Sequence, residues 1–97
     1  KALQLQPDNA AYVDSLGWFY FKKGSYKEAL KELKRAALLA EDPVIYDHVG
    51  DTYFKINDIA NAKSNWGKSL ELDPKNDSVR EKIEKIINNS ANNAAVK

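Results

Sequence analysis

Apolar residues recur along the chain at helical spacing, in blocks that share one layout. The apolar face of the first block consists of Val13, Leu16, Gly17 and Tyr20. These positions follow the i, i+3, i+4, i+7 spacing of one side of a helix. A second stripe continues after Gly24 and consists of Tyr26, Ala29, Leu30, Leu33, Ala36, Ala37 and Ala40. Because glycine is the usual left-handed residue at a helix end, the pattern predicts two helices joined by a tight turn at Gly24.

The same layout returns 33 residues later. The matching pairs are Gly17 and Gly50, Asp14 and Asp47, Tyr20 and Tyr53, and Ala29 and Ala62. The shared register extends through both helices without a gap, which a single matching glycine would not establish. Self-similarity at a period of this size is typical of helical repeat arrays. The sequence therefore predicts two helix-pair repeats, residues 10–42 and residues 43–76.

Residues that begin and end helices stand at the expected places in the second repeat. Asp42 is a predicted N-cap, and Pro43 follows at the first helical position, where a missing N–H costs little. Asn57 takes the place of Gly24 at the end of the first helix, since asparagine tolerates the left-handed conformation. Pro74 is predicted to stop the second helix.

A fifth helix is predicted over residues 77–88. Its apolar side consists of Val79, Ile83, Ile86 and Ile87. Glu84 stands where the repeats have glycine, so we expect this helix to cap the array and expose its outer side to solvent. Residues 89–97 have little to bury and are predicted to be a disordered tail.

The opening residues 1–9 parallel residues 68–76, which end a helix and enter a turn. Residues 1–9 are therefore expected to be the end of a helix from a further, truncated repeat. We expect the chain to be the C-terminal piece of a longer array.

These residues resemble the tetratricopeptide repeat, whose pattern is W-x2-L-G-x2-Y, then A-x3-F, then a closing proline. The first unit supplies Val13, Leu16, Gly17, Tyr20, Ala29 and Leu33, and the second supplies Tyr46, Val49, Gly50, Tyr53, Ala62, Trp66 and Pro74. The resemblance implies an all-α fold of antiparallel helix pairs in a right-handed superhelix, here two repeats and a C-terminal capping helix. It also implies a protein–protein interaction module. The first unit departs from the pattern, because Glu41 stands at the closing proline. The composition and the stretch from Tyr12 to Trp18 look similar to bacterial repeat proteins.

Composition and charge narrow the classes of partner that we expect for the chain. The chain has 97 residues, and its 15 lysines and arginines against 14 aspartates and glutamates leave a net charge of +1. This balance provides no global field toward nucleic acid. No apolar run approaches the roughly 20 residues that span a bilayer, so we expect no membrane insertion. The absence of cysteine excludes disulfides and leaves the cellular compartment undecided.

Candidate catalytic and metal-binding residues are few. His48 is the only histidine, and a metal site built on histidine and cysteine needs several such ligands. A triad of Ser15, His48 and Asp47 fails because the last two residues are adjacent on one helix and point about 100° apart. We therefore predict no enzyme, no metal and no cofactor.

A basic run interrupted by acids extends from the end of the first predicted helix through the second. Its members are Lys22, Lys23, Lys27, Lys31, Lys34 and Arg35, interrupted by Glu28 and Glu32. The favoured interpretation is a solvated, salt-bridged face. The alternative is a weak electrostatic contribution to binding an acidic partner.

The resemblance also implies a binding site, because in this family the first helix of each unit lines a concave groove that holds peptides. The mapped residues with an acidic or aromatic character are Asp14, Trp18, Phe21, Asp47, Asp51, Phe54 and Glu81. We hypothesise that the groove binds a protein or peptide segment with basic and apolar side chains, held by aromatic contact area and carboxylate hydrogen bonds. For Trp18, the alternatives are capping of the missing upstream helix and packing on the neighbouring unit.

Two alternative functions remain open. In the first, the chain is a structural end cap of a larger array. In the second, it forms a homodimer through the outer side of the first helix. Tyr12 and Phe19 lie on that side and have no earlier helix in the two predicted repeats to cover them.

Overall fold

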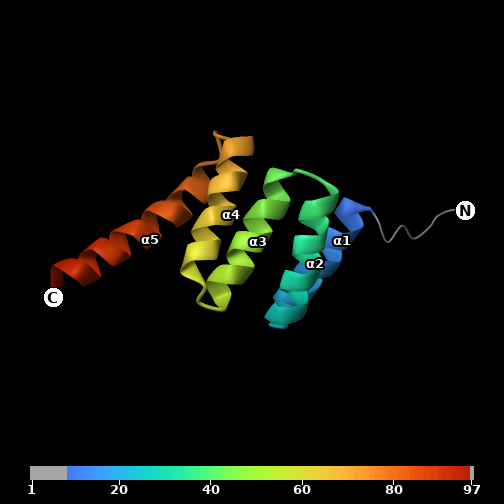
Figure 1. Cartoon of the computed structure of the whole chain (residues 1–97), viewed down its shortest axis with the longest axis horizontal. Coiled ribbons are helices and arrows are strands. Elements are labelled where there is room, and N and C mark those ends of the chain that lie inside the picture. The colour runs from blue at the N-terminus through green and yellow to red at the C-terminus, as the bar shows by residue number, and fades with distance from the viewer. Residues whose placement is uncertain (1–8, 97) are drawn as a thin grey trace, which may run out of the picture.

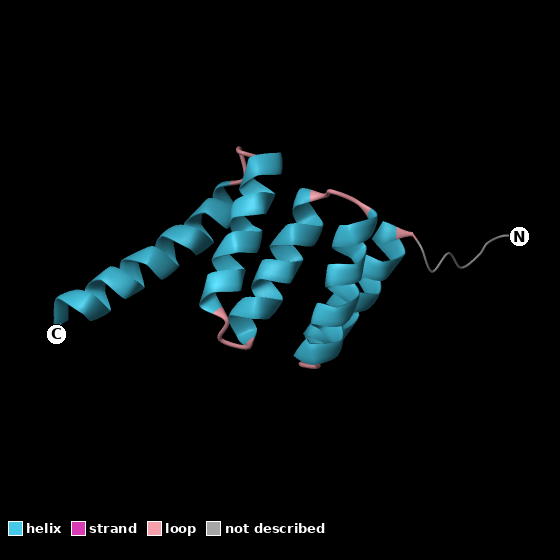
Figure 2. Ribbon diagram, viewed as in Figure 1, coloured by secondary structure: helices cyan, strands magenta, loops and turns pink. Residues whose placement is uncertain are grey.

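The computed structural model describes the backbone of residues 9–96 and the side chains of residues 9–88. The described residues form five helices and no strand (Figures 1 and 2). They are α1 (Ala10–Lys22), α2 (Tyr26–Leu39), α3 (Pro43–Lys55), α4 (Ile59–Leu72) and α5 (Asp77–Val96). The predicted helix end within residues 1–9 lies outside the described residues, apart from Asn9.

Consecutive helices pack against each other along the chain. α1 packs on α2, α3 packs on α4, α2 joins the two pairs through α3, and α5 packs on α4. In Figure 1, α2, α3, α4 and α5 follow one another in a row, and short turns reverse the chain between them. The predicted all-α array of two helix pairs and a closing helix is confirmed.

Local sequence signals place the helix ends. Asn9 Oδ1 accepts a hydrogen bond from the Tyr12 N–H at 3.0 Å, and Asp42 Oδ1 accepts one from the Val44 N–H at 2.8 Å. Such side-chain caps satisfy N–H groups that have no partner inside the helix. Gly24 and Asn57 both have positive φ, at 83° and 69°. The predicted equivalence of these two turn residues is confirmed.

Two glycines allow each helix pair to approach closely. A Cβ on Gly17 would lie 2.6 Å from Leu33 Cγ, and one on Gly50 would lie 2.4 Å from Trp66 Cδ1. No real Cβ sits this close to another carbon, so the partner side chains occupy the space that only glycine leaves free. Leu33 and Trp66 hold equivalent places on α2 and α4, which explains why the repeat conserves its register through both helices.

Two apolar clusters make up the core. The first consists of Val13, Ala29, Leu33, Ala36, Ile45 and Val49, and the second of Ala62, Trp66, Val79 and Ile86. Tyr53 packs against both clusters and so links them. Ile45 is not among the apolar positions that the sequence analysis named, and it belongs to the cluster built mainly from the preceding repeat.

Ser69 is fully buried, and its hydroxyl donates a hydrogen bond to the Pro43 carbonyl at 2.8 Å. A buried hydroxyl needs such a partner to offset its lost hydration. Ser69 therefore ties α4 to the first turn of α3.

The end of α5 differs from the prediction. The helix continues to Val96, although we predicted an end at residue 88 and a disordered tail from residue 89. The segment contains Ala91, Ala94 and Ala95 and no glycine or proline. Alanine is the best helix former, and the asparagines and serine of the segment disfavour a helix less than glycine or proline would, so a nucleated helix continues through them. A lack of apolar residues to bury was therefore an insufficient reason to end the helix, and the structure corrects that boundary.

Candidate protein-binding face

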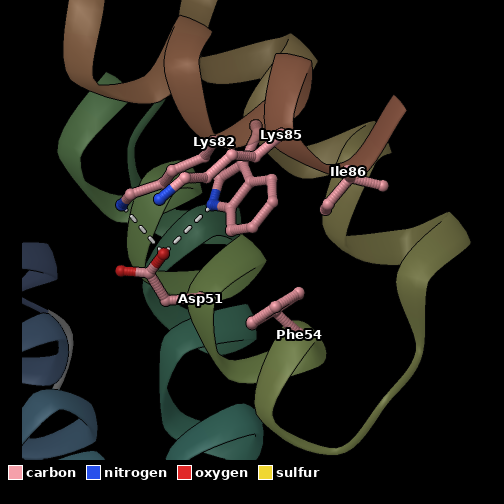
Figure 3. Close-up of a pocket in the computed structure, with 6 residues that line it drawn as sticks. Asp51, Phe54, Lys82, Lys85 and Ile86 are labelled. Atoms are coloured by element: carbon pink, nitrogen blue, oxygen red, sulfur yellow. Dashed lines mark hydrogen bonds and ion pairs between the residues drawn. The ribbon is translucent and has the colours of Figure 1, made fainter. Parts of the chain in front are cut away.

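A pocket of about 290 Å³ lies where α3, α4 and α5 meet (Figure 3). Its lining residues are Asp51, Phe54, Trp66, Lys82, Lys85 and Ile86. Trp66 is almost fully buried, whereas Phe54 is 45% exposed and lies at the pocket. Two residues of the hypothesised groove, Asp51 and Phe54, thus lie at one concave site, and the pocket itself was not predicted from the sequence.

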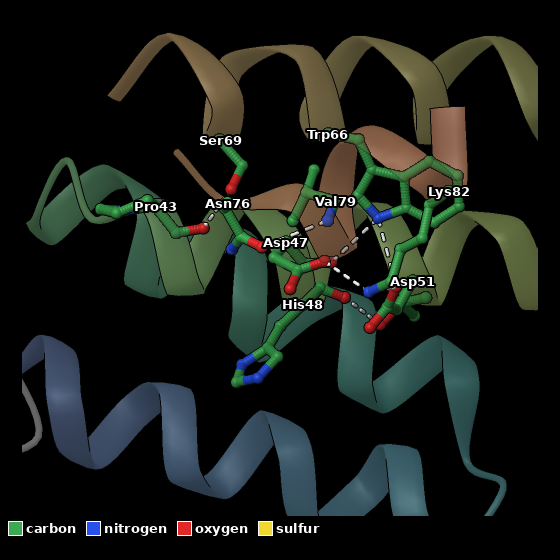
Figure 4. Close-up of polar contacts among 10 residues, drawn as sticks. Pro43, Asp47, His48, Asp51, Trp66, Ser69, Asn76, Val79 and Lys82 are labelled. Atoms are coloured by element: carbon green, nitrogen blue, oxygen red, sulfur yellow. Dashed lines mark hydrogen bonds and ion pairs between the residues drawn. The ribbon is translucent and has the colours of Figure 1, made fainter. Parts of the chain in front are cut away.

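Lys82 of α5 binds two carboxylates of α3 at this site. Its Nζ donates to Asp47 Oδ1 at 2.8 Å and to Asp51 Oδ1 at 2.9 Å (Figure 4). The Trp66 indole N–H also reaches Asp51 Oδ1, at 3.2 Å. Two carboxylates therefore share one ammonium group, which leaves one negative charge uncompensated in this cluster.

Burial and charge shift the pKa values of this cluster. Burial raises the pKa of Asp51 above its ordinary 3.8, and the neighbouring Asp47 charge adds to the rise, while the hydrogen bond from Lys82 opposes it. Burial alone would lower the pKa of Lys82, but its hydrogen bonds to Asp47 and Asp51 outweigh burial and raise that pKa. The folded chain therefore holds Lys82 protonated well into the alkaline range.

An equivalent contact joins the first repeat to the second. His48 Nδ1 of α3 lies 2.8 Å from Asp14 Oδ1 of α1. Asp14 and Asp47 occupy the same repeat position, and so do His48 and Lys82. Each carboxylate on a first helix thus contacts a basic residue on the next first helix. We call the side of α1, α3 and α5 that makes these contacts the first-helix face.

Aromatic rings cover the α1 end of the first-helix face. Trp18 stacks on Phe21 with ring centroids 4.3 Å apart, and on His48 with centroids 4.1 Å apart. The partly exposed Trp18 therefore packs on the neighbouring repeat, one of the alternatives that the sequence left open. The stack also spans α1 and α3, so it supplies contact area at the junction of the two repeats.

The sequence hypothesis named three aspartates of this face without their partners. Asp14, Asp47 and Asp51 all accept hydrogen bonds within the chain, and Glu81 is exposed and forms an ion pair with none of the described residues. Lys82 was missed, although its place in the repeat matches that of His48. The match with His48 was the sequence signal that the closing helix has a basic residue on its side of the first-helix face.

Metal and membrane sites are not found in the described part of the chain. No group of three or more histidine, cysteine, aspartate or glutamate side chains within residues 9–88 is arranged to hold a metal ion. None of the helices described is both long and apolar enough to cross a bilayer.

The comparisons with known proteins identify the repeat. A family model described as tetratricopeptide repeat matches residues 11–43 and residues 44–76, together more than half of the chain. A search of curated proteins found no significant match. The two matched ranges begin one residue after the repeats that we predicted from the sequence. With helix pairs, close-approach glycines and matched repeats in agreement, the chain belongs to the tetratricopeptide repeat family.

Proposed function

We propose that the chain binds a peptide segment with basic and apolar side chains on its first-helix face. Tetratricopeptide repeats are generally protein–protein interaction scaffolds, and this all-α repeat fold is typically non-catalytic. The residues that we assign to the site are Asp14, Trp18, Phe21, Asp47, Asp51, Phe54 and Glu81. We assign no catalytic residue.

The sharing of Lys82 by Asp47 and Asp51 carries this proposal. Each of these carboxylates accepts its hydrogen bonds through Oδ1. The Oδ2 atoms accept none from the described residues, so they are available to a lysine or arginine of a partner. A charge-assisted bond of this kind is about twice as strong as a neutral one. The half-exposed Phe54 lies at the same pocket and offers apolar contact area beside the charge.

The α1 end of the face supplies a second contact region. Asp14 also engages His48 through Oδ1 only. Trp18 and Phe21 lie stacked beside it, and tryptophan is enriched at binding hot spots. A bound segment would therefore meet an acid and an aromatic surface at both α1 and α3, with the exposed Glu81 of α5 beyond them.

The test is a selection of displayed random peptides against the intact chain. We expect the selected peptides to combine lysine or arginine with a bulky apolar residue. Replacing the three aspartates together, Asp14→Asn, Asp47→Asn and Asp51→Asn, is expected to weaken their binding at least tenfold.

The control changes three exposed carboxylates that form no ion pair among the described residues: Glu28→Gln, Glu71→Gln and Glu84→Gln. This variant has the same change in net charge and should bind like the unchanged chain. Selected peptides that bind equally to all three proteins would show that the first-helix face is not the site.

A second candidate function is association through the outer side of α1, and a periodic difference in exposure favours it. Tyr12 and Phe19 are 44% and 55% exposed. Their equivalents on α3 and α5 are Ile45, Thr52, Val79 and Ile86, all at 8% exposure or less. The outer side of α1 therefore suits another helix pair. That pair would come from a second copy, forming a homodimer, or from a further repeat, which would make this chain an end cap.

A further inference from the structure

A second groove lies between α2 and α4, with α3 as its floor. It has a volume of about 270 Å³ and is separate from the pocket at α5. Its lining residues are Lys34, Ala37, Leu38, Tyr46, Val49 and Asn65. We call it the second-helix groove, because its walls are the second helices of the two repeats. In Figure 1, α3 appears between α2 and α4.

The lining of this groove is mostly apolar and includes an unusually exposed side chain. Leu38 is 89% exposed, the highest value among the exposed large hydrophobic residues of the described part. Val49 is almost fully buried, and Ala37 and Tyr46 are partly buried around it. Pockets for drug-sized ligands usually have volumes of ~300–1,000 Å³. The smaller volume here suits one or two side chains of a protein segment.

A stripe of exposed lysines on α2 leads to the groove. Lys27, Lys31 and Lys34 are exposed and lie at i, i+4 and i+7 on α2. Helix α2 contains four basic and two acidic residues, and one of the acids, Glu32, forms an ion pair with Arg35. Lys34 lines the groove itself and makes no ion pair with any described residue. This is the basic run that the sequence analysis explained mainly as solvated surface.

The opposite wall adds a further cation. Lys68 of α4 has its Nζ 5.9 Å from the centroid of the Tyr46 ring, and it forms a long contact of 3.7 Å with Glu41. Since Tyr46 lines the groove, cations stand near both walls of an apolar floor, and Lys34 is left in excess when Glu41 is counted against Lys68. An excess of one charge beside a cleft raises the local concentration of the opposite sign.

We infer that the second-helix groove binds an acidic segment of a partner protein, with a leucine-like side chain inserted beside Leu38, Tyr46 and Val49. The insertion buries apolar surface that the folded chain leaves exposed, and acidic neighbours of the inserted residue lie against Lys34 and Lys68. The groove shares helix α3 with the first-helix face, but none of its lining residues belongs to that face. We therefore expect the two sites to bind independently.

Titration of the isotope-labelled chain with short capped peptides tests the inference. The probe peptide alternates glutamate with leucine; one comparison peptide has lysine for glutamate, and the other has alanine for leucine. The glutamate–leucine peptide is expected to shift the nuclear magnetic resonance signals of Leu38, Tyr46 and Asn65, and to leave the Trp18 indole signal in place. Both comparison peptides are expected to bind at least fivefold more weakly.

Two variants locate the binding. Lys34→Glu should weaken binding of the glutamate–leucine peptide at least fivefold, and Leu38→Ser, at an exposed position that the fold does not need, should weaken it as well. Lys85→Glu makes the same charge change at the other pocket and should leave the affinity unchanged.

Three results would overturn the inference. One is equal binding of all three peptides, and another is equal loss of affinity in Lys34→Glu and Lys85→Glu. The third is binding to vesicles of phosphatidylserine and phosphatidylcholine without binding of the peptide, which would assign the basic surface to an anionic membrane. The aspartate variants change peptide binding at the first-helix face only, so their result leaves the readouts at the second-helix groove unchanged.

Discussion

At the scale of single residues, the glycines at the helix crossings differ sharply in what surrounds them. Gly50→Ala would place its Cβ 2.4 Å from Trp66 Cδ1, whereas nothing lies within 4 Å of a Cβ at Gly67. We expect Gly50→Ala to lower the free energy of unfolding by about 1–3 kcal/mol through overpacking. Gly67→Ala, the matched control inside α4, should raise it by about 0.5–1 kcal/mol, because alanine favours the helix. Urea unfolding followed by circular dichroism measures both. Equal effects of the two variants would contradict the close approach.

The residue scale also shows what the sequence could predict of the site. Glycine, asparagine and aspartate at turns act through local backbone chemistry, so Gly24, Asn57 and Asp42 were placed correctly. The partner of Asp47 could not be found in this way, because Lys82 is 35 positions away and belongs to a helix without the repeat's glycine. Only the packing of α5 on α4 brings the ammonium group to α3.

At the scale of elements, Lys82 is a polar tie between α5 and α3. Removing the ammonium group while keeping an apolar chain, as in Lys82→Met, leaves Asp47 and Asp51 facing each other without a cation. Losing a bond to a charged group costs about 1.5–3 kcal/mol. Lys82 is 31% exposed, so solvent screening reduces the expected loss to about 1–2 kcal/mol. Thermal or urea unfolding measures it, with the exposed Lys75→Met as control. A loss no larger than that of the control would mean that this tie adds no stability.

The same tie predicts a dependence on alkaline pH. The pKa of Lys82 is raised above 10.5 in the folded chain, so folding favours the protonated amine. Its contribution is therefore fully present below pH 10.5 and is lost as the pH rises through the folded pKa. We expect the stability difference between the unchanged chain and Lys82→Met to be constant near neutral pH and to shrink above 10.5. Every other ionisable side chain is present in both proteins, so its contribution cancels in this difference. A difference that stays constant to the highest measurable pH would contradict the assigned hydrogen bonds.

Element boundaries were predictable where a breaker residue stood and unpredictable where none did. Helix α4 ends at Leu72, shortly before Pro74. Helix α5 meets no glycine or proline after Asp77 and runs to Val96. The apolar pattern predicts which side of a helix is buried. It does not predict where a solvent-exposed helix ends.

At the scale of the whole molecule, the repeat allows the first helices α1, α3 and α5 to be compared position by position. The position of Tyr12 on α1 is taken by Ile45 on α3 and Val79 on α5, and exposure falls from 44% to 3% and 0%. In α3 and α5 this position is covered by the preceding helix pair. The fold therefore carries the same docking side on every unit. On α1 that side remains largely open.

Replacing both exposed aromatics of α1, Tyr12→Ser and Phe19→Ser, tests whether that open side joins two copies of the chain. Exposed side chains contribute little to folding, so the variant should unfold within about 0.5 kcal/mol of the unchanged chain at low concentration. If two copies associate there, the mass measured by sedimentation should rise with concentration for the unchanged chain and stay monomeric for the variant. Leu38→Ser is the matched control, because it removes an exposed apolar side chain from α2 and should leave association intact. If the unchanged chain stays monomeric at every concentration, the homodimer is excluded. The end-cap alternative then remains, in which the open side of α1 receives another repeat.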